Sequence, residues 1–213
     1  MTIRNAASMP AYLSEWEVRG YHGCGNVQEL LGTLTGRNAI ICGNGQGVFE
    51  ELAQAQAALD EPVIFAVNDV GMFLPHIDHW ASLHTDNLGA WKAVRWLNCK
   101  STAKTVYHGV DTRPHVDYVW DRLSPQMALS GYFAMQLAWI MGAERIVLAG
   151  CPGEQTRRFF EAAPRDDFGY GGHSSHSDHG IRQQVEQEMK RLPDFKQAVR
   201  SMSGWTQAFF GGL

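Results

Sequence analysis

A short glycine-rich turn is the strongest local pattern for ligand chemistry. The apolar run Asn38–Cys42 ends at Gly43-Asn44-Gly45-Gln46-Gly47, and apolar residues at helical spacing follow from Val48 to Leu59. Positions without a side chain let the main chain approach a phosphate, and the first N–H groups of a helix attract its charge. The pattern therefore predicts phosphate binding by Gly43, Asn44, Gly45, Gln46 and Gly47. A tight strand-to-helix turn without a ligand is the alternative.

Other common chemistries lack their sequence patterns. The third glycine of the turn comes one residue earlier than in the dinucleotide fingerprint, and no acidic residue stands cleanly at the end of the next strand, so NAD binding is not favoured. The chain has no Gly-x-Ser-x-Gly elbow and no P-loop, and Cys151 has no neighbouring base in the sequence. These absences favour a nucleotide site that works without a covalent intermediate or a resident cofactor.

Polar side chains follow the next two predicted strands. Asn68 and Asp69 come directly after the run Val63–Val67, and His84-Thr85-Asp86-Asn87 closes the run that begins at His79. The carboxyl ends of parallel strands meet at one edge of a sheet, where Asn and Asp side chains can bind ribose hydroxyls. We expect Asn68 and Asp69 to contact a nucleotide, whereas Asp86 is better explained as a helix cap.

A serine and a glycine interrupt the most apolar stretch of the chain. Ser130 and Gly131 lie early in the predicted helix Met127–Met141, in which Ser130 and Gln136 are the only polar side chains. A hydroxyl beside a residue that permits close approach suits contact with a base or ribose. A glycine that packs helices, beside a serine bonded to its own helix, explains the pair equally well.

Three histidines fall within seven residues of a polar segment. His173, His176 and His179 are interleaved with Ser and Asp178, and Tyr170 and Arg165 are neighbours. An imidazole near neutral pH can act as a general base or contact a phosphate, and three of them can bind zinc. Because their spacing matches no strict ligand motif, no metal is expected; a solvated loop without a role is the remaining alternative. His76 and His79 are interpreted as surface or turn residues.

The elements that position these residues alternate between strand and helix. Strands are predicted at Asn38–Cys42, Val63–Val67, His79–His84, Thr105–His108, Arg145–Ala149 and near Lys196–Met202. Helices are predicted at Ser8–Trp16, Asn26–Leu34, Val48–Leu59, Leu88–Leu97, Met127–Met141, Ile181–Arg191 and Trp205–Phe210. Such alternation predicts an α/β, Rossmann-like, mostly parallel sheet with helices on both faces. Residues 1–37 are expected as a helical segment packed on the sheet, residues 38–213 as a nucleotide-binding domain, and Cys151–Asp178 as a candidate lid.

Composition excludes two classes of partner. The 213 residues include 18 basic and 22 acidic side chains, a formal charge of −4, without a tract dense in Lys or Arg. This balance argues against nucleic-acid binding and against binding to anionic lipid. No apolar stretch has the length of a signal peptide or a membrane span, so a cytoplasmic protein is expected. The four cysteines are interpreted as buried free thiols in a reducing compartment.

The order of these motifs resembles that of bacterial single-domain sialyltransferases. The resemblance is carried by Ile40-Ile41-Cys42-Gly43-Asn44-Gly45, Phe65-Ala66-Val67-Asn68, Ser130-Gly131, Ile146-Val147-Leu148-Ala149-Gly150 and His176-Ser177. Archaeal hydroxymethylpterin diphosphokinase-like and flagellin-modifying transferase-like domains share part of the pattern. The similarity spans about residues 38–210. Two departures are that Gln46-Gly47 replaces a usual Pro-Ser and that Cys151-Pro152-Gly153 replaces an acidic residue, for which Glu154 is a substitute.

The resemblance implies a metal-independent transfer reaction. The glycine turn and Asn44 would meet the phosphate, and Asn68 and the Ser130 region the nucleoside. His176, with His173 in reserve, would remove the proton of the acceptor hydroxyl while a nucleoside monophosphate leaves. The leading hypothesis is therefore a glycosyltransferase-like enzyme that binds a nucleotide or nucleotide-sugar and transfers the sugar by direct displacement.

Two other functions remain open from the sequence. Short members of this fold occur in phage genomes, and the altered turn together with the aromatic, glycine-rich end Trp205–Leu213 suits a non-catalytic assembly protein of a phage particle. Such a protein would be a virion component that binds phage structural proteins or a second copy of itself. A zinc-dependent hydrolase built on His173, His176 and His179 is the third hypothesis.

Overall fold

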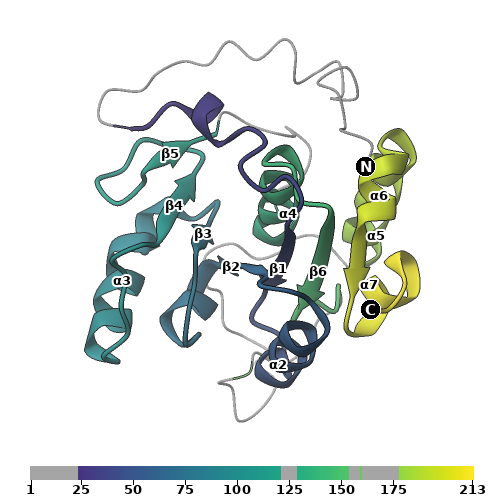
Figure 1. Ribbon diagram of the computed structural model, residues 1–213, viewed down its shortest axis with the longest axis horizontal. Coiled ribbons are helices and arrows are strands. Elements are labelled where there is room, and N and C mark those ends of the chain that lie inside the picture. Colours follow the sequence, from purple (N-terminus) through teal and green to yellow (C-terminus); the bar gives the residue numbers. More distant parts are fainter. Residues whose placement is uncertain (1–23, 121–128, 154–158, 160–177) are drawn as a thin grey trace.

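The computed structural model, which describes residues 24–120, 129–153, 159 and 178–213, contains one sheet of parallel strands in this part of the chain (Figure 1). The strand order is β5-β4-β3-β2-β1-β6-β7 and every neighbouring pair is parallel. The strands are β1 Asn38–Cys42, β2 Val63–Val67, β3 His79–Ala81, β4 Val106–Gly109, β5 Tyr118–Val119, β6 Arg145–Ala149 and β7 Val199–Ser201. The predicted Rossmann-like α/β class is confirmed.

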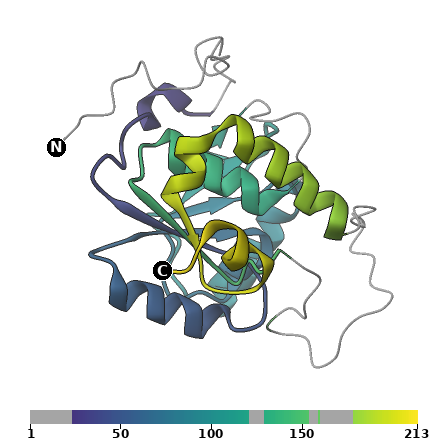
Figure 2. The same ribbon diagram turned by 90° about the vertical axis from the view of Figure 1, so that its right-hand side faces the viewer.

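Helices cover both faces of this sheet (Figure 2). On one face lie α2 (Val48–Ala58) and α3 (Leu88–Leu97); on the other lie α4 (Ser130–Ile140), α5 (Asp178–Arg191) and α6 (Pro193–Ala198), while α7 (Gly204–Phe210) packs beside β7. Three short 3-10 helices, η2 (Val27–Leu30), η3 (Asn68–Met72) and η4 (Thr85–Asn87), complete the described elements.

Alternate residues of each central strand pack into two separate hydrophobic cores, one on each face of the sheet. Ile40 and Ile64 pack with Leu52 of α2, whereas Ile41 and Phe65 pack with the α4 side. A strand that is covered on both faces reads as a continuous apolar run rather than an alternating one. The bounds predicted for β1, β2 and β6 therefore agree with the structure.

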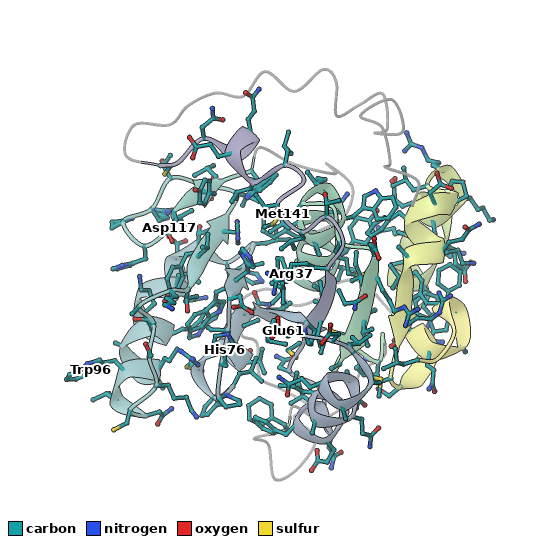
Figure 3. All side chains as sticks on the ribbon, in the orientation of Figure 1. Arg37, Glu61, His76, Trp96, Asp117 and Met141 are labelled. Carbon is teal, nitrogen blue, oxygen red and sulfur yellow. The ribbon has the colours of Figure 1, made fainter. Side chains whose placement is uncertain are left out.

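The helix α4 is buried almost all round, as its sequence predicts. Ser130 and Gln136 are 6% and 5% exposed, so even its polar side chains are enclosed. By contrast, α3 ends with exposed apolar residues. Figure 3 shows Trp96 projecting away from the rest of the protein, and this side chain is among the most exposed large apolar residues at 73%.

Several predicted elements differ from the structure. β3 ends at Ala81 rather than His84, because the Ser82 hydroxyl accepts the N–H of His84 and turns the chain. The last strand was expected to begin near Lys196, but Lys196 lies in a helix, α6, that begins at Pro193. Proline is favoured in the first turn of a helix, which explains the difference. The short strand β5 and the contraction of Asn26–Leu34 to the four-residue η2 were not predicted.

The N-terminal segment is anchored on the α4 side of the sheet where the structure describes it. Val27 and Leu34 are buried in that core, and the Leu34 N–H donates to the Met141 carbonyl at 2.7 Å. The predicted helix Ser8–Trp16 lies outside the described residues. Within the described part of the chain, no helix has the length and apolar character needed to cross a membrane.

The cysteines do not share one environment. All four are free thiols; Cys42 is buried, Cys24 and Cys151 are half-buried, and Cys99 is exposed. The prediction of a buried thiol is wrong for Cys99, because it follows the end of α3 with a positive φ of 57° and faces solvent. Burial raises the pKa of the Cys151 thiol to about 12, so this group is protonated at neutral pH.

Candidate functional site

The glycine turn lies against the end of β6. A Cβ atom at Gly43 would come 2.4 Å from the Gly150 carbonyl oxygen, and one at Gly45 would come 2.8 Å from the same atom. The Gly43 N–H donates to the Ala149 carbonyl and the Gly45 N–H donates to the Gly150 carbonyl, at 2.8 and 2.9 Å. These two glycines are therefore required by the close approach of β1 and β6, and their N–H groups are already used.

Other main-chain groups of this turn are available to a ligand. In the described part of the chain, the N–H groups of Asn44, Gln46 and Gly47 have no hydrogen-bond partner. Gly47 has a φ of 89° and precedes α2 as its N-cap. The first turn of α2 carries Glu50 and Glu51, which offset the positive end of the helix dipole. An anion at this turn would therefore depend on the turn itself more than on the helix dipole.

Glu51 supplies a carboxylate beside the end of β6. Its Oε2 atom accepts the Gly150 N–H at 2.7 Å. The sequence lacks the expected acidic residue at Cys151-Pro152-Gly153, and the predicted substitute, Glu154, lies outside the described residues. Among the described residues, the acidic group at this point comes from α2, which sequence order alone did not indicate.

Asn44 joins the glycine turn to the end of β2. Its Nδ2 atom donates to Asp69 Oδ1 at 3.0 Å, and its carbonyl accepts the Phe159 N–H at 3.1 Å. The Phe159 ring makes edge contacts with Phe49 and Phe73, at centroid distances of 5.0 and 5.3 Å. Asn44 is thus fixed through both its side chain and its main chain.

Asn68 has a left-handed main chain at the end of β2. Its φ of 54° is uncommon for a residue other than glycine, although Asn tolerates it. The Trp80 indole donates to the Asn68 carbonyl at 2.6 Å, and the Ser82 hydroxyl donates to Asn68 Oδ1 at 2.8 Å. Such conformations persist where the surroundings enforce them, and they cluster at functional sites.

Ser130 and Gly131 bring the start of α4 to the same edge. The Leu83 N–H donates to Ser130 Oγ at 3.3 Å, so this hydroxyl contacts the segment after β3. A Cβ at Gly131 would meet no atom of the described residues within 4 Å. The structure therefore favours the interpretation of Gly131 as a position open to close approach over that of a helix-packing glycine.

The structure brings together one group of the predicted residues and leaves another outside its description. Residues at the carboxyl ends of β1, β2 and β3 and at the start of α4 are linked by the contacts above: Asn44, Asn68, Asp69 and Ser130. Tyr170, His173 and His176 lie outside the described residues, as does Arg165; of His179 only the main chain, in α5, is described. Among the described residues, no group of three His, Cys, Asp or Glu side chains is placed to hold a metal.

Some residues of this edge differ from the sequence interpretation. Asp86 pairs with Arg113 at 2.9 Å, both exposed, and among the described residues the N-cap of α3, Asn87, has no side-chain capping bond. The expected capping role is therefore wrong. Ser82 was not predicted, although its position directly after β3 on the same edge was a usable signal. Phe159 was not predicted because its contacts come from segments far away in the sequence.

The interpretation of His79 as a surface or turn residue is also wrong. His79 is 8% exposed, stacks on Phe65 at 4.5 Å, and its Nδ1 lies 2.9 Å from His108 Nε2. Trp120 Nε1 donates to His108 Nδ1 at 3.0 Å, so the proton of neutral His108 is on Nε2 and is donated to His79. Burial lowers the pKa of His79 to about 4 and that of His108 well below its usual value. Both rings are neutral at pH 7.

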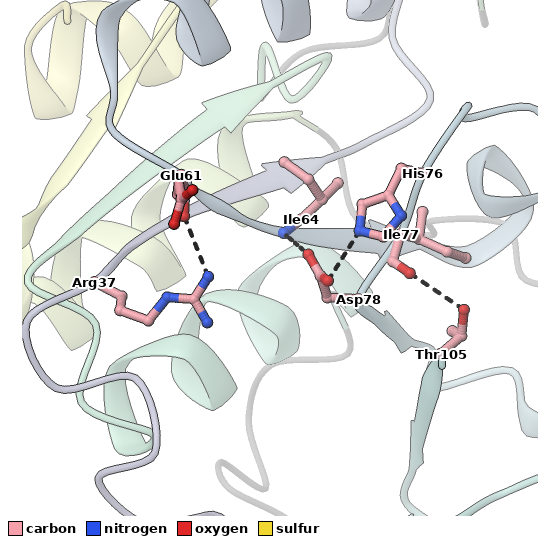
Figure 4. A network of polar contacts seen from close by, with 7 residues as sticks. All are labelled: Arg37, Glu61, Ile64, His76, Ile77, Asp78 and Thr105. Carbon is pink, nitrogen blue, oxygen red and sulfur yellow. Dashed lines mark hydrogen bonds and ion pairs between the residues drawn. The ribbon is translucent and has the colours of Figure 1, made fainter. Parts of the chain in front are cut away.

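The opposite, amino edge of the sheet carries structural contacts (Figure 4). Asp78 accepts the Ile64 N–H at 2.8 Å and contacts His76 Nε2 at 2.9 Å, while Arg37 donates to the Glu61 carbonyl at 3.2 Å. His76 is exposed, as predicted. These contacts tie the starts of the strands to the loops before them.

The aromatic end of the chain packs largely on the protein itself. Trp205 stacks on Phe209 with a centroid distance of 5.0 Å, and Phe210 is buried. Lys196 Nζ lies 3.9 Å from the centre of the Phe209 ring. Much of the aromatic surface that the sequence offered for docking to a partner is therefore used within the fold.

The architecture and its polar edge define a Rossmann-like α/β protein with a candidate ligand site at the carboxyl ends of β1, β2 and β3. No protein-family model matches the sequence, and no curated protein matches it either. Among solved structures, the chain is similar to the sialyltransferase CstII from Campylobacter jejuni, solved in complex with a substrate analogue, cytidine-5′-monophosphate. The TM-score is 0.56 at 14% identity, over 84% of this chain and 85% of that chain. The protein thus has a sialyltransferase-like fold; the resemblance to pterin diphosphokinase-like domains and the phage origin stay predictions.

Proposed function

We propose that this protein binds a nucleotide or nucleotide-sugar at the carboxyl edge formed by β1, β2, β3 and the start of α4, and transfers the sugar to a hydroxyl acceptor. The observation that carries the proposal is the left-handed Asn68, held by Trp80 and Ser82. The start of α4 reaches the same edge through Ser130, next to which the described residues leave Gly131 open. The similar fold of a sialyltransferase solved with cytidine-5′-monophosphate supports the proposal.

Each residue of the edge has a defined part in this proposal. The N–H groups of Asn44, Gln46 and Gly47, which have no partner among the described residues, bind phosphate oxygens in a turn shaped by Gly43 and Gly45. Asp69 fixes the Asn44 amide. Asn68, Ser130 and Gly131 face the nucleoside, and Tyr170 contributes a further contact.

The chemistry is a direct displacement that needs neither metal nor cofactor. The acceptor oxygen forms a bond to the anomeric carbon as the bond from that carbon to the phosphate oxygen breaks. The nucleotide leaves with the electron pair of the broken bond. His176, with His173 in reserve, accepts the proton of the acceptor hydroxyl.

Thermal unfolding with a panel of nucleotides tests the proposal. A ligand at about one hundred times its Kd stabilises a fold by about 2.7 kcal/mol, which raises Tm measurably. We expect at least one pyrimidine or purine nucleotide to raise the Tm of the wild type and to have little effect on Asn68→Ala. The matched control is Asn98→Ala, an exposed asparagine after α3, which should respond like the wild type. The proposal is overturned if no nucleotide binds the wild type at millimolar concentration.

His176→Ala tests the proposed base separately. This variant should bind the same nucleotide as the wild type but lose most of its transfer to an acceptor, since general-base catalysis typically contributes a hundredfold or more, on the order of 10² to 10⁴. Full turnover in both His176→Ala and His173→Ala would remove these residues from the mechanism while leaving nucleotide binding intact.

A further inference from the structure

Ser82 is a fully buried hydroxyl at the carboxyl edge of the sheet. It follows β3 directly and is 0% exposed. Its oxygen accepts the main-chain N–H of His84 at 2.8 Å, so the hydroxyl proton must find a separate acceptor. A buried donor without an acceptor is costly.

Asn68 Oδ1 is that acceptor. It lies 2.8 Å from Ser82 Oγ, and no other acceptor for this hydroxyl is found among the described residues. The amide of an asparagine can be placed in two ways that differ by exchange of oxygen and nitrogen, and the hydrogen-bond network decides between them. Here the hydroxyl proton of Ser82 requires the oxygen on its side. The Nδ2 group is therefore turned away from Ser82.

The main chain of Asn68 is fixed as firmly as its amide. The Trp80 indole holds its carbonyl at 2.6 Å, and the left-handed conformation sets the direction in which the side chain leaves the strand. Within the part of the chain that the structure describes, Asn68 Nδ2 has no hydrogen-bond partner. Asn68 therefore presents two oriented N–H donors at this edge.

We propose that Ser82 is a positioning residue of the nucleotide site, because it holds the Asn68 amide with its N–H donors toward the ligand. The inference rests on the function proposed above and adds to it the kind of ligand atom that Asn68 recognises, namely a hydrogen-bond acceptor. Asn68 selects a ligand atom that accepts hydrogen bonds, which in a nucleotide is either an oxygen or nitrogen of the nucleoside or a phosphate oxygen. Without Ser82 the amide can rotate and present its oxygen, which repels such an atom.

A double-mutant cycle on the binding of CMP tests this coupling. Calorimetric titration of CMP should show binding to Ser82→Ala that is about tenfold weaker, the scale of one oriented hydrogen bond. If Ser82 acts through Asn68, the double variant Ser82→Ala, Asn68→Ala binds CMP no more weakly than Asn68→Ala alone. Wild-type affinity in Ser82→Ala, or losses that add in the double variant, overturns the inference.

A matched serine separates positioning from stability. Ser201 on β7 is also 0% exposed, and its hydroxyl lies 2.7 Å from Thr206 Oγ1, so Ser201→Ala removes a comparable buried hydrogen bond away from Asn68. Both alanine variants should lower Tm, but only Ser82→Ala should weaken CMP binding. Equal weakening in the two variants would show that Ser82 is merely structural.

A second variant, Asn68→Asp, tests the inference even if Ser82→Ala does not fold. Asn68→Asp keeps an acceptor for the Ser82 hydroxyl but replaces the N–H donors with oxygen, so it should bind CMP at least as weakly as Asn68→Ala. Binding at wild-type strength would show that the donors do not face the ligand. This outcome differs from failure of the proposed function, in which the wild type itself binds no nucleotide.

Cytidine identifies the atom that Asn68 contacts. If the acceptor belongs to the nucleoside, Ser82→Ala weakens the binding of cytidine and CMP by the same factor. If the acceptor is a phosphate oxygen, only CMP binding weakens. Either pattern agrees with the inference, whereas no change for both probes contradicts it.

Discussion

Glycines that look alike in the sequence are needed for different physical reasons in this protein. Gly43 and Gly45 have no room for a side chain because the end of β6 lies against them, whereas Gly131 faces space that the described residues leave open. The sequence pattern predicted phosphate contact for the first pair. The structure shows that packing alone already requires those glycines, while the turn's N–H groups at residues 44, 46 and 47 have no partner in the described part of the chain.

This difference predicts opposite results for two alanine variants. Gly43→Ala should lower the free energy of unfolding by about 2 kcal/mol, because its Cβ would press on the Gly150 carbonyl. Gly131→Ala should leave stability unchanged or slightly higher, since alanine favours a helix, but should weaken nucleotide binding. Urea denaturation and calorimetry measure the two effects. A strongly destabilised Gly131→Ala would show that its space is filled by the protein.

The paired imidazoles predict a loss of stability in acid. The pKa of His79 is about 4 in the fold against an ordinary value of 6.5, chiefly because of burial, with Asp78 opposing and Arg37 adding to the shift. The unfolded chain therefore binds a proton below pH 6.5 that the folded chain does not bind until about pH 4. The contribution of His79 to the free energy of unfolding is therefore fully present above pH 6.5 and is lost as the pH falls from 6.5 to about 4. The loss amounts to about 3 kcal/mol.

Urea denaturation at about pH 7 and about pH 4.5 measures this loss. His79→Gln, which keeps an acceptor for His108 but does not titrate, should reduce the difference between the two conditions. His76→Gln, at the exposed histidine nearby, should leave most of it. Equal pH dependence in the wild type and His79→Gln would exclude His79 as its source.

At the level of the helices and strands, a side chain of α3 fixes η3, the 3-10 helix that follows β2. Arg95 is 1% exposed, and its guanidinium donates to the carbonyls of Gly71, Leu74 and Ser101 at 2.8, 2.7 and 3.0 Å. Burial lowers the pKa of this group, and neutral carbonyls take the place of a counter-ion in these contacts. The element that contains Asn68 and Asp69 is therefore fixed to its neighbour by one side chain.

Replacing Arg95 should destabilise the fold strongly. Arg95→Met keeps much of the volume but leaves three carbonyls without this donor, and the free energy of unfolding should fall by about 3 kcal/mol or more. Arg95→Lys restores the charge but not the planar fork of donors, so it should recover only part of the loss. Thermal and urea unfolding measure the expected order of stability, with the wild type highest, Arg95→Lys intermediate and Arg95→Met lowest. A fully stable Arg95→Met would contradict the anchoring role.

Much of the element structure could be predicted from the sequence, for physical reasons that also explain the errors. β1, β2 and β6 are apolar runs bounded by turn residues, and their bounds agree. β5 has only two residues, too few for a pattern, and it pairs through contacts with β4. The convergence of Asn44, Asn68, Asp69 and Ser130 followed from parallel topology, whereas Ser82 and Phe159 act through contacts that no spacing rule indicates.

For the whole molecule, the strand order decides where a ligand can lie. The chain runs outward from β1 to β5 and then crosses back through α4 to β6 on the other side of β1. In such sheets the crevice at the switch point is the usual ligand site. Here hydrogen bonds from Gly43 and Gly45 to the end of β6 join the two strands at this point. The available polar edge therefore lies toward β2, β3 and α4.

The most direct test of a nucleotide site at the carboxyl edge is a nuclear magnetic resonance titration of the isotope-labelled protein with CMP. A nucleotide site at this edge predicts that amide signals at the carboxyl ends of the strands, those of Asn44, Asn68, Ser130 and Gly131, shift as the nucleotide is added. Signals at the amino edge, such as those of Ile64 and Asp78, should stay in place. Shifts confined to the amino edge, or no shifts at millimolar CMP, would contradict a nucleotide site at the ends of β1, β2 and β3.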